Sequence, residues 1–85
     1  MSVYAPYSIE QTEYICASLR NGDVVVLNLR DTAAELGARI LDFTFGAASM
    51  IGAQVDCPAP KVFVVCKGAA LSQSEMASLQ KQGVL

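Results

Sequence analysis

Apolar residues recur at helical spacing between Asp31 and Ala53, and this stretch dominates the hydrophobic pattern of the chain. Residues at steps of three and four lie on one face of a helix; here they are Leu36, Ile40, Phe43, Ala47 and Met50. A second apolar stripe lies roughly on the opposite side and comprises Leu41, Phe45 and Ala48. The pattern therefore predicts a long helix that buries one face on its own sheet and needs a second partner for the other face.

Local signals place the two ends of this helix. Thr32 followed by Glu35 fits a capping box, in which the hydroxyl and the carboxylate bind free amides at the helix start. Gly52 favours a helix end, because glycine suits the left-handed residue after a helix. Gly46 lies inside the helix, where glycine costs about 1 kcal/mol relative to alanine. Gly46 is either a tolerated defect or a point of close approach by another backbone or side chain, and we favour the close approach.

The remaining apolar runs predict a small sheet. Four short runs rich in β-branched and apolar residues are typical of strands, at residues 3–7, 24–29, 53–57 and 61–66. The second run is almost unbroken in its apolar residues, which indicates a central strand covered on both faces. The last two runs flank Pro58-Ala59-Pro60 and predict an antiparallel hairpin.

Two shorter amphipathic stretches predict helices. Ser8 and Gln11 fit a capping box for the first helix, and its buried face is expected to contain Thr12, Ile15, Cys16 and Leu19. The last helix is expected over residues 71–82 and has a thin apolar face, so it should fray or dock only onto a neighbour; its capping pair and apolar contacts are Ser72, Glu75, Met76 and Leu79. The expected fold class is an α/β sandwich of one domain, residues 1–85, with helices packed on one face of a small mixed β-sheet.

Composition excludes several classes of function. The 85 residues suffice for one small domain, and a hydrophobic content of 53% argues against disorder of the whole chain. The net charge is −2 and the six basic residues are scattered, which argues against a nucleic-acid surface and against a polybasic membrane patch. Because the sequence shows neither a signal peptide nor a transmembrane run, we expect the chain as it stands to be cytosolic.

Catalytic and metal chemistry have little support. The chain contains no histidine, so neither a Ser-His nor a Cys-His pair is available. The three cysteines are odd in number and lack CxxC spacing, which predicts buried, reduced thiols rather than disulfides or a zinc site; they are Cys16, Cys57 and Cys66. Helix caps and a solvated polar stripe explain the acidic side chains more simply than a cation site does; these are Asp31, Glu35 and Asp42. We therefore expect no enzyme, no cofactor and no metal.

One motif resembles a known family. The stretch Arg39-Ile40-Leu41-Asp42-Phe43-x-x-Gly46, which follows Val24-Val25-Val26-Leu27-Asn28-Leu29, is similar to the core domain of SepF. The resemblance extends from about Tyr4 to Cys66. SepF proteins are cytoplasmic cell-division proteins that tie the FtsZ polymer to the membrane. They usually carry an amphipathic membrane helix before the core, so membrane attachment is expected only through a segment absent from this chain.

The resemblance implies a partner and a dimer. The partner is the C-terminal peptide of FtsZ, bound at the division site by a homodimer or by a higher polymer built from it. In the family the glycine that corresponds to Gly46 lies at a helix contact between subunits, so the expected dimer interface is Gly46, Leu41, Phe45 and Ala48. Phe63 falls where the family places an aromatic residue that helps hold the FtsZ tail. We expect Phe43 to form the wall behind it and Lys61 or Arg39 to meet carboxylates of the tail.

Two alternatives stay open at this point. Phe63 is either a peptide anchor or an ordinary residue of the sheet core. The domain itself is either an FtsZ-binding adaptor or a dimeric small-ligand-binding or regulatory domain, since small α/β domains host many functions. A pocket lined with convergent polar groups would favour the ligand-binding domain. An apolar groove between subunits, rimmed by Lys61 or Arg39, would favour the adaptor.

Overall fold

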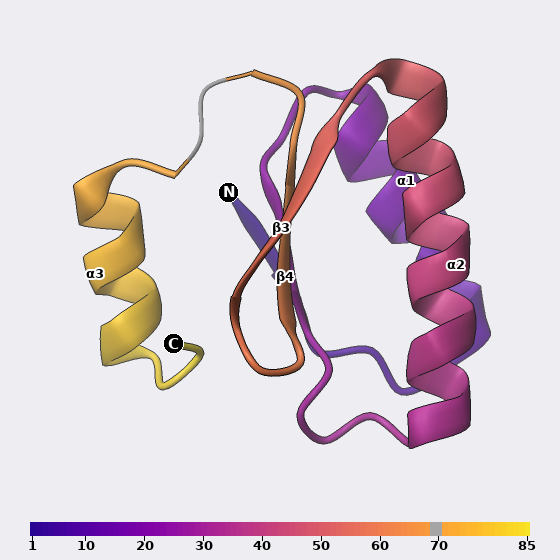
Figure 1. Cartoon of the computed structure of the whole chain (residues 1–85), viewed down its shortest axis with the longest axis horizontal. Helices are drawn as coiled ribbons and strands as arrows, with labels where there is room; N and C mark the ends of the chain where they lie inside the picture. Colours follow the sequence, from indigo (N-terminus) through magenta and orange to yellow (C-terminus); the bar gives the residue numbers. More distant parts are fainter. Residues whose placement is uncertain (69–70) are drawn as a thin grey trace.

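A four-stranded mixed sheet lies between two layers of helices in the computed structural model, which describes residues 1–68 and 71–85 (Figure 1). The strands lie in the order β1-β2-β4-β3, with bounds Ser2–Tyr4 for β1, Val25–Asn28 for β2, Gln54–Ala59 for β3 and Val62–Cys66 for β4. The helices are α1 at Thr12–Arg20, preceded by a 3-10 turn, α2 at Ala34–Ile51 and α3 at Gln73–Lys81. Strand β1 runs parallel to β2, whereas β4 runs antiparallel to both β2 and β3. The predicted fold class is confirmed, and dimerisation stays a prediction.

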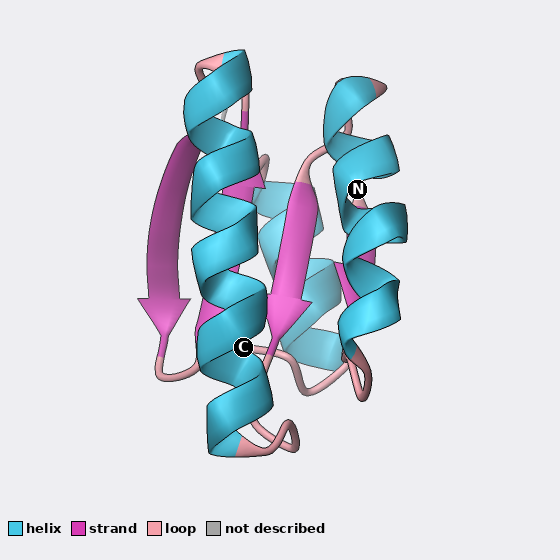
Figure 2. Cartoon of the chain, turned by 90° about the vertical axis from the view of Figure 1, so that its right-hand side faces the viewer, coloured by secondary structure: helices cyan, strands magenta, loops and turns pink. Residues whose placement is uncertain are grey.

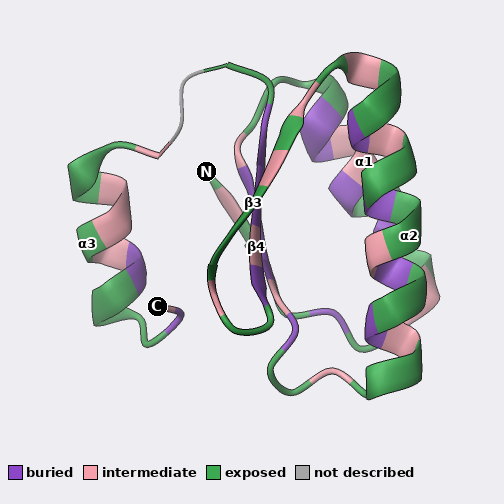
Figure 3. Ribbon diagram, in the orientation of Figure 1, coloured by how far each residue is buried: buried purple, intermediate pink, exposed green. Residues whose placement is uncertain are grey.

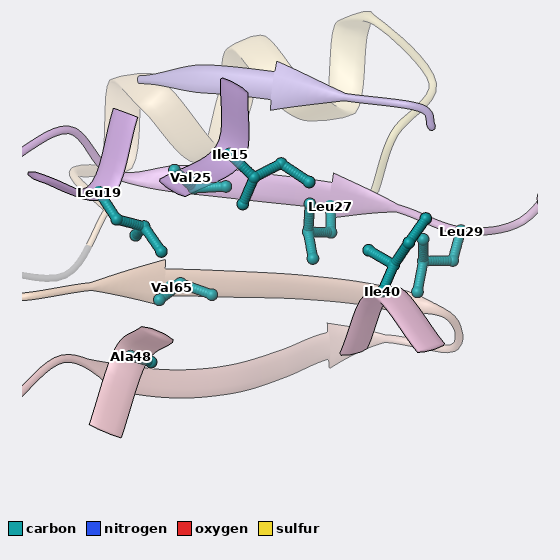
Figure 4. Close-up of a cluster of buried hydrophobic side chains, with 8 residues drawn as sticks. All are labelled: Ile15, Leu19, Val25, Leu27, Leu29, Ile40, Ala48 and Val65. Atoms are coloured by element: carbon teal, nitrogen blue, oxygen red, sulfur yellow. The ribbon is translucent and has the colours of Figure 1, made fainter. Parts of the chain in front are cut away.

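Helices α1 and α2 cover one face of the sheet, where the larger part of the core lies (Figure 2). Their buried side chains meet those of β2 and β4 in one apolar cluster (Figure 4), formed by Ile15, Leu19, Val25, Leu27, Leu29, Ile40, Ala48 and Val65. The face predicted for α1 is correct, since Ile15 and Leu19 are both buried. Burial of this cluster is the main favourable contribution to folding, because apolar area removed from water is stabilising.

Helix α3 packs on the opposite face of the sheet (Figure 1). A smaller cluster joins it to the strands, formed by Val26, Val62, Val64, Leu79 and Val84. The expectation of helices on one face therefore holds for α1 and α2, whereas α3 takes the other face. Strand β2 contributes to both clusters, with Val25 on one side and Val26 on the other. This confirms the prediction of a central strand covered on both faces. In Figure 3 buried residues lie along the middle of the sheet, between the two helical layers.

The side of α2 that packs on the sheet differs from the side expected from its apolar residues. Its buried residues are Gly37, Ile40, Thr44 and Ala48. Phe43 and Met50, which the apolar pattern places on the buried face, are 50% and 87% exposed. The hydroxyl of Thr44 donates to the carbonyl of Ile40 at 2.7 Å, so this side chain is buried without an unpaired donor. The small residues on the buried side allow the helix to lie close to the sheet. The larger Phe43 and Met50 lie outside this contact and are exposed.

The start of α2 also corrects a prediction, because Thr32 does not cap it. The helix begins at Ala34, and Ala33 stands at the N-cap without a side-chain hydrogen bond. The hydroxyl of Thr32 instead donates to the carbonyl of Pro6 at 2.7 Å and joins two distant loops. The predicted end is correct, since Gly52 adopts a left-handed conformation with φ of 71°.

The other two capping predictions are confirmed. At the start of α3 the Ser72 hydroxyl accepts from the Glu75 amide at 3.2 Å, and the Ser72 amide donates to the Glu75 carboxylate at 3.0 Å. This confirms the predicted capping box, and the backbone hydrogen bond from Ser72 lowers the pKa of Glu75. Before α1, the amide of Ser8 donates to the side-chain oxygen of Gln11 at 3.0 Å, as a capping box requires.

Candidate functional site

An apolar groove of about 280 Å³ opens between the first half of α2 and the start of β4. Its lining combines small, aliphatic and aromatic residues with one charged side chain, and comprises Leu29, Thr32, Ala34, Gly37, Ala38, Leu41, Lys61 and Phe63. Four segments contribute to it: the end of β2, the loop before α2, α2 itself and the hairpin between β3 and β4. Such a concave apolar surface with few polar groups is typical of a binding site.

The groove exists because the part of α2 that faces it carries small side chains. Ala34, Gly37 and Ala38 lie at helical spacing and leave the space above Leu29 open. A Cβ atom at Gly37 would lie 3.8 Å from Thr32 Cγ2 and 3.9 Å from Leu29 Cδ1. These distances are ordinary van der Waals contacts, so an alanine at position 37 would fit beside these neighbours.

Phe63 belongs both to the core and to the groove. It lies in β4, opposite Leu27 of β2, and packs partly against the main apolar cluster. Its ring also meets the ring of Phe45 edge to face, with centroids 6.5 Å apart and an interplanar angle of 88°. Phe45 is 43% exposed, so this aromatic pair reaches from the core to the surface.

Lys61 is the charged residue that lines the groove. It lies in the turn between β3 and β4 with φ of 62°, a left-handed conformation that is uncommon for a residue other than glycine. The carbonyl of Lys61 accepts from the amide of Leu29 at 2.8 Å, which ties the turn to the end of β2. Strand β3 extends through Pro58 with a shift in register, so the turn is tighter than the Pro58-Ala59-Pro60 turn expected from the sequence.

The structure separates the four candidate partner-binding residues into two groups. Phe63 and Lys61 line the same groove. Phe43 lies on the other flank of α2, in a shallow hollow that also contains Gly46 and Met50. Arg39 is exposed and does not line the groove. Within one subunit, neither Phe43 nor Arg39 therefore occupies the place beside Phe63 that we expected for it.

The four candidate dimer residues also lie in different surroundings. Ala48 is 2% exposed and contacts the core of its own chain, so in the isolated subunit it offers almost no surface to a partner. Leu41 lines the groove and Phe45 contacts Phe63. Gly46 is exposed, and a Cβ atom there would meet nothing within 4 Å. No contact inside the subunit therefore requires glycine at position 46.

The three thiols occupy three environments, which corrects the expectation that all are buried. Cys66 is buried, Cys16 is half-buried, Cys57 is exposed, and all are free. Burial raises the pKa of the Cys16 thiol, and the nearby charge of Arg20 opposes this effect. A raised pKa reduces the thiolate fraction, so Cys16 is a poor nucleophile at neutral pH.

Metal-binding clusters and membrane-spanning helices were sought in the part of the chain that the structure describes. Within residues 1–68 and 71–85, no group of three or more histidine, cysteine, aspartate or glutamate side chains is arranged to hold a metal ion. None of the helices in these ranges combines the length and the apolar character needed to cross a bilayer.

Sequence reasoning missed much of the groove. It identified Phe63, Lys61 and Leu41, whereas Leu29, Thr32 and the small residues of α2 had no assigned role in binding. A signal was present, since Ala34, Ala38 and Leu41 recur at steps of four and three beside Gly37. A stripe of small residues on a helix indicates close packing or an open groove, and only the tertiary structure distinguishes the two.

Comparison with known proteins assigns a family to most of the chain. The sequence model described as "Cell division protein SepF" matches residues 1–66. A cell division protein SepF of Carboxydothermus hydrogenoformans is 33% identical over 76 residues, which cover 89% of this chain and 56% of the relative. One of Caldicellulosiruptor bescii is 34% identical over 65 residues, which cover 76% and 45%. One of Clostridium botulinum is 24% identical over 78 residues, which cover 92% and 52%. The chain thus spans about half the length of the curated relatives it matches.

Proposed function

The chain belongs to the SepF family of cell division proteins, and on that premise we propose that it is an adaptor at the division site. It binds the C-terminal tail of FtsZ in the groove between α2 and β4, and as a homodimer it links the division ring to the membrane. The observation that carries this proposal is the groove itself: its lining is apolar, and Lys61 supplies one positive charge. A small-ligand site would need convergent polar groups, and the lining of this groove lacks them.

The chemistry of the groove fits a short, partly apolar peptide with acidic residues. Phe63 and Leu41 offer apolar surface to a side chain of the tail, and Lys61 offers a charge partner to a carboxylate. A disordered tail loses conformational entropy when it becomes ordered, so a single peptide is expected to bind with a Kd of about 1–100 μM. A dimer with two grooves gains avidity on a polymer that displays many tails, without any new contact.

The direct test is titration of a labelled FtsZ tail peptide against the folded protein, with a scrambled peptide of the same composition as the control. We expect saturable binding of the tail and at least tenfold weaker binding of the scrambled peptide. Absence of saturable binding at low salt, with the protein still folded, would contradict the adaptor function.

Filling the groove tests where the tail binds. Gly37→Leu is expected to weaken binding of the tail by at least tenfold, because the new side chain occupies space beside Leu29 and Thr32. Leucine has a higher helix propensity than glycine, but Gly37 is buried, so the fold of this variant has to be measured together with its affinity. Circular dichroism and peptide titration on the same samples separate loss of binding from loss of fold. Unchanged affinity in a folded Gly37→Leu protein would place the tail elsewhere.

Gly46 tests the proposed dimer. Gly46→Lys is expected to abolish association, because a long charged side chain would enter a close helix contact between subunits. Gly46→Ala is the matched variant for the isolated subunit: with no atom within 4 Å of its Cβ, it should stabilise the monomer by about 1 kcal/mol. Light scattering measures the mass of each protein. If the unmodified protein is a monomer at high concentration, the proposal of a homodimer is wrong.

The thiols are expected to be dispensable for binding. Replacing Cys16, Cys57 or Cys66 singly by alanine should change the affinity for the tail by less than about threefold, because none of them lines the groove. Thiol titration of the unfolded protein should find all three reduced. Loss of binding in a folded Cys57→Ala protein would assign that exposed thiol a direct role.

A further inference from the structure

The second face of the sheet is covered by α3 and residues 82–85, which together form a thin layer called the cover below. Val26, Val62 and Val64 form an apolar surface on this face, and each is at most 5% exposed because the last part of the chain lies over it. The buried residues of that part are Leu79 in α3 and Val84 after it. A single buried side chain, Leu79, is little for a 9-residue helix, so the docking of α3 depends on a small apolar contact that Val84 extends.

The packing beneath α3 is also incomplete. A hollow of about 280 Å³ lies between the start of α3 and the sheet, lined by Asp56, Pro58, Val64, Leu71 and Met76. Side chains that line a hollow lose part of their dispersion contacts, which weakens the attachment of the helix at that end. The first half of α3 is therefore held less firmly than the second half, which carries Leu79.

One polar contact joins the end of this cover to the loop between β2 and α2. Among residues 1–68 and 71–85, a single hydrogen bond connects α3 and the residues after it to the rest of the domain. Arg30 Nη1 donates to the carbonyl of Gly83 at 2.8 Å. Arg30 belongs to the loop between β2 and α2, and this contact lies at the end of the cover that also carries Val84.

We propose that α3 is a detachable cover, held by Leu79 and Val84 and latched by Arg30, that opens while the sheet and the other two helices stay folded. Residues 1–66, which match the family as a unit, contain all four strands and both helices of the main core. Opening exposes the surface of Val26, Val62 and Val64 without breaking any hydrogen bond of the sheet. The inference is independent of the proposed binding of FtsZ.

Native-state hydrogen exchange on the complete chain tests the opening. Amides of α3 are expected to have protection factors at least tenfold lower than amides in the middle of β2 and β4, because local opening costs less free energy than global unfolding. Their exchange should also depend little on dilute denaturant, since a local opening exposes little surface. Equal protection and equal denaturant dependence in α3 and β4 would overturn the proposal.

Two substitutions test the parts of the attachment. Arg30→Gln is expected to lower the protection of α3 amides by about threefold to tenfold, which corresponds to loss of one hydrogen bond. Amides of β2 and β4 should change by less than twofold. Arg20→Gln, at an exposed arginine on the other helical layer, is the matched control and should leave α3 unchanged.

Leu79→Ala should bring the amides of α3 close to the exchange rate of an unfolded peptide, with the sheet still protected. If Arg30→Gln leaves the protection of α3 unaltered, Arg30 is not a latch. If either substitution lowers the protection of β4 as much as that of α3, the helix and the sheet form one cooperative unit and the cover does not detach.

Discussion

Replacing Ile40 by alanine is expected to lower the free energy of unfolding by about 2–5 kcal/mol. Ile40 is fully buried in the main apolar cluster, where α2 meets the sheet, so its removal leaves a cavity with few ways to collapse. Small domains are stable by only about 5–15 kcal/mol. This single change therefore removes a large fraction of the stability, and partial unfolding at 37 °C is expected.

Met50→Ala is the matched control on the same helix. The apolar pattern assigns Ile40 and Met50 to one buried face, but Met50 is 87% exposed. Its replacement should change the free energy of unfolding by less than about 0.5 kcal/mol. Urea unfolding should be followed by circular dichroism at a concentration where light scattering shows a monomer, because association adds its own stability. Equal losses of stability in the two variants would contradict the observed orientation of α2, in which Ile40 is buried and Met50 is exposed.

Phe63→Ala is expected to weaken binding of the FtsZ tail by at least tenfold, more than Lys61→Glu does. Phe63 lies within the groove and is held in place by Phe45, whereas Lys61 is exposed. Central aromatic anchors usually contribute more to affinity than charges at the rim, which act mainly on the association rate and its salt dependence. Peptide titration at low and at physiological salt separates the two contributions.

Stability must be measured beside affinity, because Phe63 also packs on the core. Truncation of a buried phenylalanine typically costs about 3–5 kcal/mol, and a half-buried one costs less. Phe63→Leu keeps most of the apolar volume and should remain folded, with loss of the edge contact to Phe45. Tyr7→Ala, at an aromatic residue that is 83% exposed in a loop, is the control and should bind like the parent protein. Parent-like affinity of a folded Phe63→Ala protein would make Phe63 a residue of the sheet core alone.

Features with a local cause could be predicted from the sequence. The unbroken apolar run at residues 24–29 correctly predicts a central strand, because such a run has no solvated side. Gly52 marks the end of α2, and Ser72 with Glu75 marks the start of α3, because each signal acts within a few residues. The SepF motif in α2 correctly indicates the family that the comparisons show.

The side of α2 that faces the sheet and the position of the groove depend on contacts between distant segments. Apolar residues surround much of α2, so its periodicity alone does not determine which side packs on the sheet. The structure buries Thr44 and Ala48 rather than Phe43 because small side chains permit the closer approach. The same geometry separates Phe43 from Phe63, which the motif alone had placed together.

By itself, the sequence determined the elements of this protein, their approximate ends, the central strand and the family, because propensity, caps and apolar runs act over short distances. Only the tertiary structure decided which face α3 covers, how α2 is rotated and where the groove lies. These features follow from pairs such as Thr32 with Pro6 and Phe45 with Phe63, which are far apart in the chain. Such pairs form only when the whole core packs. The geometry of the site therefore depends on the close packing of the complete domain.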